Sequence, residues 1–313
     1  MKERIAILVP SFNGGTLLAE TVASVARAGL PAKSYAILVS DNASSDDSAE
    51  RLPRLDAQGA PILLYRNESN LGRIANWNRA IERAEGLDFS YALFLMVGDV
   101  LVNAHILGLR DRMERAGASL GIASYEVADE ALKPCRIARR IRWAGDPEKG
   151  IAARAFLAQS FGAGAMLYGP LGANLYRLGG PRLRFDPADE THTDQMATAV
   201  FAQEAAAPLV YLDKPVSRWR SRPGRFHASM DPMRRLADDI RIIEAACRAA
   251  KIAPDYTKIR ASLMLRAFFY SRDARAAWTQ SKILTQGAPP SWLWLATLLR
   301  RQAQYRTPWL VEA

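Results

Sequence analysis

Residues 91–99 have the sequence Tyr-Ala-Leu-Phe-Leu-Met-Val-Gly-Asp, and the other predicted elements are arranged around this stretch. The apolar run 91–96 fits a strand buried on both faces, and a glycine and a single carboxylate, Asp99, follow it closely. In open α/β sheets ligands bind outside the carboxyl ends of the strands, so an acid at such an end is a candidate for site chemistry. The alternative is that Gly98 and Asp99 only turn the chain, because both residue types favour turns.

The composition is that of an ordinary globular protein. Of the 313 residues, 49% are hydrophobic and 24% are charged. The two cysteines, Cys135 and Cys247, lie far apart, so neither a disulfide scaffold nor a cysteine zinc site is expected, and a reducing cytosol is the natural compartment. The first apolar run breaks at Pro10, which makes it too short for a signal peptide. No uninterrupted apolar run reaches about 18 residues, so no membrane span is predicted.

The net charge of +10 is spread unevenly along the chain. Residues 1–100 carry 10 Lys and Arg against 12 Asp and Glu, whereas residues 214–313 carry 19 against 7. A basic second half favours anionic partners, and the alternative is a solvated, arginine-rich exterior. The basic residues form no continuous stripe, and the sequence has no recognised nucleic-acid-binding motif, so nucleic acid is not expected as a partner.

Strands and helices alternate around the stretch 91–99. Strands are predicted at 5–9, 35–39, 61–66 and 91–96, and helices at 16–28, from about 48 to 58 and at 73–85. This alternation predicts a parallel sheet, and the loops after the strands, rich in Asn, Asp, Ser and Gly, then converge on one edge. That edge is expected to bind something polar. Neither GxGxxG nor GxxxxGK[ST] occurs, which disfavours the two common nucleotide cradles.

Four motifs in order carry a family resemblance. They are Val9-Pro10-Ser11-Phe12-Asn13, the run 39–46 beginning Val-Ser-Asp-Asn, the run 70–78 beginning Asn-Leu-Gly-Arg, and Phe94-Leu95-Met96-Val97-Gly98-Asp99. Together they resemble the family 2 glycosyltransferases of the GT-A fold. The resemblance implies a Rossmann-like, mostly parallel α/β sheet flanked by helices. It also implies transfer of a sugar from a nucleotide diphosphate sugar to an acceptor hydroxyl, with inversion and with Mg²⁺ or Mn²⁺.

The resemblance assigns roles residue by residue. The positions that would bind the donor are Pro10, Ser11, Asn13, Asp41, Asn70, Gly72, Arg73, Asn76, Gly98 and Arg220. Asp41 would contact the base, and Asp99 would match the last acid of the DxD metal motif. Val97 stands where the family usually has the first acid of that motif. A single carboxylate holds a divalent ion weakly, because such ions take several oxygen ligands.

The general base is assigned to the acidic island 185–213, which has no Lys or Arg. Asp194 opens a predicted helix there and would take the proton from the acceptor hydroxyl. Its alternative role is a helix-capping acid, since the helix macrodipole favours acids in the first turn. Glu190 is the reserve candidate, and Asn174 is placed near the acceptor by the resemblance.

The stretch 214–227 is interpreted as a loop that clamps the diphosphate. Arg218, Arg220 and Arg222 are candidate contacts to the donor phosphates, and His227 is a candidate metal or phosphate ligand. The alternative is an arginine-rich surface loop.

The remainder is predicted to be helical, at 232–251, 256–270, 272–286 and 290–304. Trp292 and Trp294 precede Arg300 and Arg301, a pattern that suits a helix lying on an anionic bilayer surface. Packing of these aromatic residues onto the catalytic domain or a second subunit of a homodimer is the competing interpretation. The predicted division is a GT-A domain at 1–230, with a nucleotide half at 1–100 and an acceptor half at 101–230, and a helical region at 231–313.

The leading hypothesis is a cytoplasmic or membrane-peripheral glycosyltransferase of cell-surface polysaccharide or glycolipid synthesis, acting on a glycan or lipid-linked acceptor. The alternative is a degenerate relative that binds a nucleotide sugar without transferring it, which Val97 motivates. Saturable nucleotide binding without turnover would distinguish the second from the first.

Overall fold

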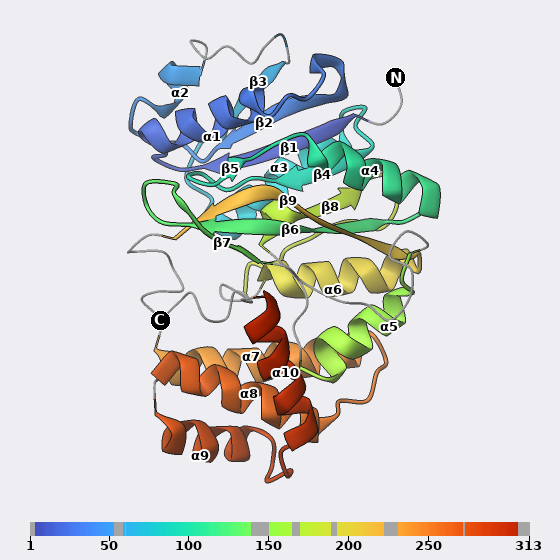
Figure 1. Cartoon of the computed structure of the whole chain (residues 1–313). Helices are drawn as coiled ribbons and strands as arrows, with labels where there is room; N and C mark the ends of the chain where they lie inside the picture. The colour runs from blue at the N-terminus through green and yellow to red at the C-terminus, as the bar shows by residue number, and fades with distance from the viewer. Residues whose placement is uncertain are drawn as a thin grey trace.

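The computed structural model describes residues 4–52, 59, 61–138, 150–164, 170–188, 193–221, 231–271 and 273–305. Within these residues nine strands form one sheet, in the order β3-β2-β1-β4-β8-β6-β9-β5, with β7 paired to β6 (Figure 1). The strands are β1 (Ile5–Ser11), β2 (Tyr35–Asp41), β3 (Ile62–Arg66), β4 (Tyr91–Phe94), β5 (Val100–Leu101), β6 (Leu120–Ala128), β7 (Pro134–Ala138), β8 (Asn174–Arg177) and β9 (Leu209–Arg220). The α-helices are α1 (Gly15–Arg27), α2 (Ser48–Arg51), α3 (Arg73–Glu85), α4 (His105–Ala116), α5 (Ala153–Leu157), α6 (Thr193–Ala205), α7 (Pro232–Ala249), α8 (Tyr256–Ser271), α9 (Ala274–Leu284) and α10 (Trp292–Tyr305).

The first four strands pair in parallel, as the alternation of strands and helices predicts. β1 lies between β2 and β4, and β3 pairs with the outer side of β2. The register places Ser11 opposite Asp41, and Asp41 opposite Arg66, so the carboxyl ends of three strands lie in one row. The loops that follow them therefore meet at one edge of the sheet.

The rest of the sheet is mixed rather than mostly parallel. β8 runs antiparallel to both β4 and β6, whereas β6 and β9 are parallel to each other. The expectation of a loop from residue 214 onward is wrong up to Arg220, because β9 continues through Leu209–Arg220. The register between β6 and β9 shifts on each side of Ser124, which lies opposite Pro215. These irregularities let β9 continue past Pro215, which has no N–H to donate to the sheet.

Both faces of the sheet are covered, which explains why the central strands are apolar throughout. In β1 the side chains of Ile5, Ile7 and Val9 pack in one cluster with residues of α1 and α4. Ala6 and Leu8 point to the other face and pack with residues of α3, α6 and α7. Alternation along a strand buried on both sides requires apolar residues at every position.

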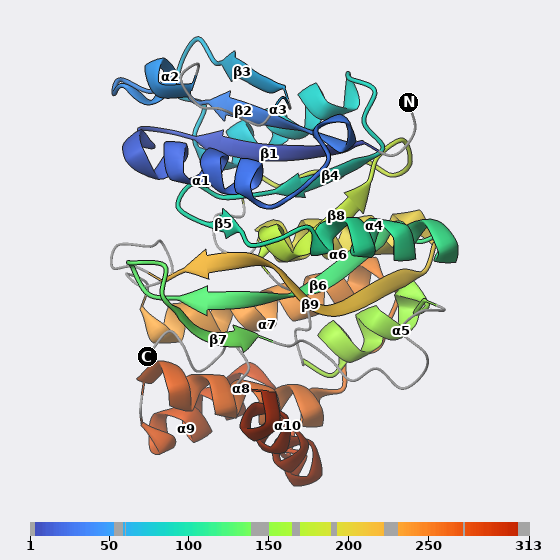
Figure 2. The ribbon, with the colours of Figure 1, turned by 45° about the horizontal axis from the view of Figure 1, so that its top comes forward.

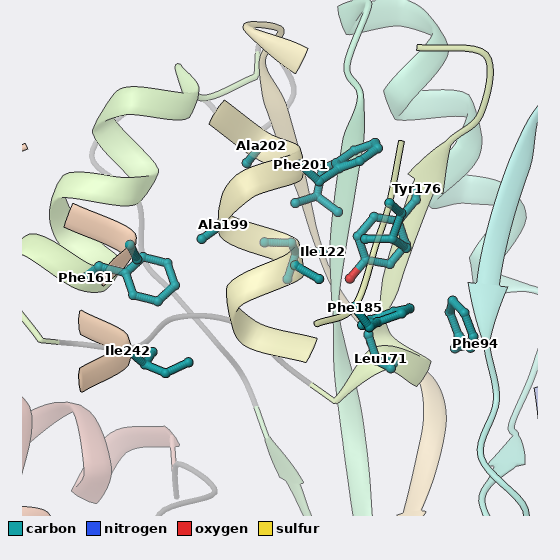
Figure 3. Packing of buried hydrophobic residues seen from close by; sticks show 14 of the residues in the cluster. Phe94, Ile122, Phe161, Leu171, Tyr176, Phe185, Ala199, Phe201, Ala202 and Ile242 are labelled. Atoms are coloured by element: carbon teal, nitrogen blue, oxygen red, sulfur yellow. The ribbon is translucent and has the colours of Figure 1, made fainter. Parts of the chain in front are cut away.

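The core of the sheet continues into the helical region. Figure 3 shows Phe94 of β4, Tyr176 of β8 and Phe201 of α6 in one packed cluster that reaches Ile242 of α7. Tyr176 and Phe201 meet edge to face, with ring centroids 5.3 Å apart. Such aromatic contacts favour one packing geometry between β8 and α6.

Helices α7–α10 gather at the end of the molecule opposite β1–β3 (Figure 2). Their observed bounds lie within a few residues of those predicted from the sequence. The carboxylate of Asp231 caps α7 by accepting from the backbone N–H groups of Met233 and Arg234. Among the described residues, no helix is both long and apolar enough to cross a bilayer.

Candidate active site

The loops after β1 and β2 are joined by hydrogen bonds at the carboxyl edge of the sheet. Asn13 adopts a left-handed backbone (φ 49°), a conformation that asparagine tolerates better than most residues. Its N–H donates to Ser44 Oγ (2.8 Å), and its Oδ1 accepts from the N–H of Ser45 (2.9 Å). Asn13 therefore fixes the position of one loop against the other. Pro10 and Ser11 form the end of β1 beside them.

Asp41 is buried at the end of β2, with 1% of its surface exposed. Its carboxylate accepts from the hydroxyl of Ser44 and lies 3.6 Å from Nε of Arg66. These contacts show that Asp41 organises the loop after β2. Its predicted contact with a nucleotide base stays a prediction.

A network of asparagine side chains joins the ends of β2 and β3 to the start of α3. Asn42 Nδ2 donates to Asn70 Oδ1 (2.7 Å), and Asn42 Oδ1 accepts from Asn67 Nδ2 (3.0 Å). Asn67 Nδ2 also donates to Asn76 Oδ1 (3.0 Å), which accepts from Ser40 Oγ as well (2.8 Å). Asn42, Asn67 and Asn76 are buried and Asn70 is exposed, so the network joins the interior to a rigid polar surface at the sheet edge.

The network holds Asn70 and Asn76 at this edge, where their contact with the donor stays a prediction, and it includes residues that were not predicted in the sequence analysis. Asn42 and Asn67 received no role there, although each directly follows a strand. Arg83 also belongs to the network, because its guanidinium donates to Ser40 Oγ (2.7 Å) and Asn67 Oδ1 (2.9 Å). The positions of Asn42 and Asn67 directly after two neighbouring strands could have indicated their role from the sequence. The role of Arg83 could not be predicted in this way, because it depends on contacts between residues far apart in the sequence.

Gly72 and Arg73 start helix α3 at this edge. Gly72 has a φ of 82°, which residues with a side chain rarely adopt, and its carbonyl accepts from Asn42 Nδ2 (3.2 Å). The guanidinium of Arg73 lies over the ring of Trp77, 4.9 Å from its centroid. Both residues therefore lie beside the asparagine network.

The turn after β4 is held by Arg220, the last residue of β9. Asp99 is 4% exposed, and its Oδ1 accepts from the backbone N–H of Arg220 (3.0 Å). The Arg220 side chain donates to the carbonyls of Gly98 (2.9 Å) and Glu130 (3.1 Å) and pairs with the carboxylate of Glu20. Arg220 is itself 7% exposed, so the structure gives it a positioning role. Its predicted contact with a donor phosphate stays a prediction.

The described residues do not by themselves fit a divalent-ion site. Asp99 is nearly buried and binds a backbone N–H, and Val97 contributes no ligand. Within the described part of the chain, no group of three or more His, Cys, Asp or Glu side chains could hold a metal ion. His227, the other predicted ligand, lies outside the described residues, as do Glu190 and Arg222.

Asp194 lies in the first turn of α6, next to strand β8. β8 is antiparallel to β4, so its first residue, Asn174, lies near the carboxyl end of β4. Asn174 is fully buried, and its Nδ2 donates to the hydroxyl of Tyr176 (3.2 Å). The Tyr176 hydroxyl meets Thr198 Oγ1 (2.8 Å), which donates to the carbonyl of Asp194 (2.7 Å).

These contacts form a directed chain of hydrogen bonds. Thr198 gives its only hydroxyl proton to Asp194, so it must accept from Tyr176. Burial is the main cause that raises the pKa of the Tyr176 hydroxyl, so this group remains a proton donor throughout the physiological range. These hydrogen bonds therefore fix the first turn of α6, which carries Asp194, against strand β8.

Replacement of Thr198 by valine is expected to destabilise the protein by about 1–3 kcal/mol. Valine has the same shape but leaves the buried Tyr176 hydroxyl without its acceptor. The free energy of unfolding from urea titration is the measurement. Thr198→Ser keeps the hydroxyl and is the matched control, expected to lose less than the valine variant. Equal losses for the two variants would show that the hydrogen-bond chain contributes nothing.

Comparison with known proteins agrees with this geometry. A model of the family described as "Glycosyl transferase family 2" matches residues 6–169. The match covers the asparagine network, the turn with Gly98 and Asp99, and β6. A search of curated proteins found no match.

Solved structures show the same fold at low sequence identity. TarS from S. aureus, residues 1–349 in complex with UDP-GlcNAc, superposes with a TM-score of 0.59 at 14% identity, over 91% of this chain and 82% of that one. The mannosyltransferase PcManGT from Pyrobaculum calidifontis, in complex with GDP-Man and Mn²⁺, superposes with a TM-score of 0.54 at 15% identity, over 97% of this chain and 81% of that one. The chain is thus similar in fold to GT-A glycosyltransferases.

Proposed function

The chain belongs to glycosyl transferase family 2 and is a glycosyltransferase, and we propose that its donor is a nucleoside diphosphate sugar. The observation that carries this proposal is the edge where β1–β4 end. There two joined loops and an asparagine network, of which Asn42, Asn67 and Asn76 are buried, form a polar edge, and β8 begins with Asn174 near the carboxyl end of β4. The donors bound by the two similar structures, UDP-GlcNAc and GDP-Man, support this class of donor.

We propose that Asp194 acts as the general base. The acceptor hydroxyl attacks the anomeric carbon, its proton passes to the Asp194 carboxylate, and the bond from that carbon to the diphosphate oxygen breaks. Attack opposite the leaving group inverts the anomeric centre. The positive end of α6 favours a carboxylate at this position, and the hydrogen-bond chain from Asn174 to the backbone carbonyl of Asp194 holds the helix turn that carries it.

The donor pocket is assigned to the loops at the ends of β1, β2 and β3. Asp41 and the asparagine network give these loops a fixed shape, so donor binding need not first order them. Arg220 holds the turn of Gly98 and Asp99 next to the pocket. Mg²⁺ or Mn²⁺ stays a prediction, since the described residues supply too few ligands to hold such an ion alone.

For the acceptor, we propose a glycan or lipid-linked hydroxyl of cell-surface polysaccharide or glycolipid synthesis, reached from the cytoplasmic side. The fold does not select the sugar, and this part of the proposal rests on the family resemblance of the four sequence motifs.

One observation favours a second candidate, a protein that binds the donor without transferring it. Val97 replaces an acid, and the remaining Asp99 is nearly buried and bonded to Arg220. Such a protein would keep the asparagine network and the joined loops but would have no turnover.

A transfer assay separates the two candidates. The purified protein is incubated with UDP-, GDP-, dTDP- and CDP-sugars, each with and without Mn²⁺, and release of the nucleoside diphosphate is measured. Slow hydrolysis to water gives a signal even without the natural acceptor, and proton NMR of the released sugar reports inversion. Release from one donor class supports the transferase. Saturable binding with no release from any donor would support the binding protein instead.

A further inference from the structure

Helix α10 has two apolar faces, and the part of the chain that the structure describes covers only one of them. Toward the protein lie Trp294 and Leu298, and the Trp294 indole N–H donates to the Ala163 carbonyl (3.1 Å). On the other side Trp292 is 60% exposed and Leu293 is 81% exposed. Leu299, seven residues after Trp292 and so on the same side of the helix, is 46% exposed. A helix that is apolar all round is normally covered on every side.

Helix α9 extends this exposed surface. Trp278 and Ile283 are 42% and 64% exposed. The rings of Trp278 and Trp292 stack with centroids 6.1 Å apart and planes inclined by 15°. Arg260 on α8 is buried, and its guanidinium lies 4.6 Å from the centroid of the Trp278 ring. The two tryptophans are thus held as a fixed pair, and we call these five exposed residues, Trp278, Ile283, Trp292, Leu293 and Leu299, the tryptophan face.

The charged side chains of helices α9 and α10 are all basic, and the acid next to them is the exposed Asp273 at the N-cap of α9. Arg275, Lys282 and Arg300 are exposed on the same two helices. Between residues 274 and 311 the sequence contains no Asp or Glu. Exposed tryptophan and leucine bordered by cations are the features of helices that lie in the headgroup layer of an anionic membrane.

We propose that the tryptophan face docks onto an anionic phospholipid bilayer, with α9 and α10 lying along its surface. Trp292 and Leu293 would enter the boundary between headgroups and acyl chains, while Lys282 and Arg300 would contact lipid phosphates. The inference does not depend on the proposed donor chemistry, because no residue of the carboxyl edge takes part in it.

A second copy of the chain is the less suitable occupant. Pairing this face with itself would bring Arg275, Lys282 and Arg300 of one copy close to the same cations of the other. No acidic side chain of residues 274–311 is present to offset that repulsion. An anionic surface complements the charge and covers the apolar side chains at the same time.

Vesicle co-sedimentation of the full chain, without any nucleotide, tests the proposal. The probes are vesicles of phosphatidylcholine alone and of phosphatidylcholine with about 30% phosphatidylglycerol. Binding to the anionic vesicles is expected, and it should weaken strongly at about 1 M salt, where the Debye length falls to about 3 Å. Leu293→Glu should reduce binding about tenfold or more, because it places a charge in the buried layer.

Lys282→Glu has a matched control in Lys33→Glu, which makes the same charge change on an exposed lysine beside β2. Lys282→Glu is expected to weaken binding to anionic vesicles about tenfold or more, and Lys33→Glu to leave it close to wild type. Three results would overturn the proposal. They are absence of binding to anionic vesicles, equal effects of the two lysine variants, and a dimer in solution that Leu293→Glu dissociates.

Discussion

Asp194→Asn is expected to lower the transfer rate by about 10²- to 10⁴-fold, the range typical of a general base. Asparagine has the same shape, but it cannot accept the proton of the attacking hydroxyl. The backbone carbonyl of Asp194 still accepts from Thr198 in this variant, so the start of α6 and its contact with β8 persist. Donor affinity is therefore expected to stay within about threefold of wild type, because the carboxyl edge of β1–β3 is unchanged.

The control for this variant is Glu204→Gln, which makes the same chemical change on an exposed residue in the last turn of the same helix. It should transfer at the wild-type rate. Single-turnover transfer and donor affinity are measured side by side for both variants. Unchanged turnover in Asp194→Asn would show that Asp194 is only a helix-capping acid. Loss of donor binding would instead place it in the donor pocket.

Asp239→Leu is expected to destabilise the protein by about 3–5 kcal/mol. Asp239 on α7 is 1% exposed, and its Oδ2 lies 2.7 Å from Nη1 of Arg266 on α8, which is 5% exposed. Removal of the carboxylate leaves a guanidinium buried between two helices without its counter-charge. Helices α7 and α8, which pack into the same core as the sheet, would then lose a contact that fixes one against the other.

Urea unfolding of two further variants separates the ion pair from general damage. The double variant Asp239→Leu with Arg266→Met removes both charges and should recover most of the loss, since apolar residues often replace a buried pair well. Glu82→Gln breaks the exposed pair of Glu82 with Arg79 on α3 and should cost at most about 1 kcal/mol. A loss for Asp239→Leu as small as that of Glu82→Gln would contradict the account.

The elements of the fold were largely predictable because local signals agree with tertiary packing. The predicted helix 73–85 coincides with α3, which starts after Gly72 and ends before Gly86. The apolar runs became the central parallel strands, since a strand covered on both faces needs no polar positions. The resemblance of the four motifs also predicted the family and its GT-A fold.

The stretch 214–220 was predicted as a loop because it holds several cations and a proline. It is a strand because its backbone pairs with β6, and two of its cations have partners far away in the sequence. Arg218 pairs with Glu126 on β6, and Arg220 pairs with Glu20 on α1. Neither pairing leaves a local pattern, so propensity alone could not find it.

The location of the candidate site could be predicted from the sequence, but the hydrogen bonds within it could not. The convergence of loops at one edge follows from a parallel sheet, and Asn13, Asn70 and Asn76 lie at that edge. Asp41 and Asp99, in contrast, are buried, and hydrogen bonds donated by Ser44 and by the backbone of Arg220 offset the cost of burying their carboxylates. Those donors come from other loops and strands, and only the folded chain brings them close.

We infer that the carboxyl edge of β1–β4 binds a nucleoside diphosphate, and titration of the protein with nucleotides tests this inference. Thermal unfolding of the purified protein is followed against UDP, GDP, dTDP and CDP, each with Mn²⁺ and with EDTA. A ligand at 100 times its Kd adds about 2.7 kcal/mol to the stability of the native state. We expect one nucleotide to raise the unfolding temperature, and we expect Asn42→Ala, which opens the asparagine network, to lose most of that rise. Unfolding temperatures that no nucleotide changes, with or without Mn²⁺, would contradict the inference.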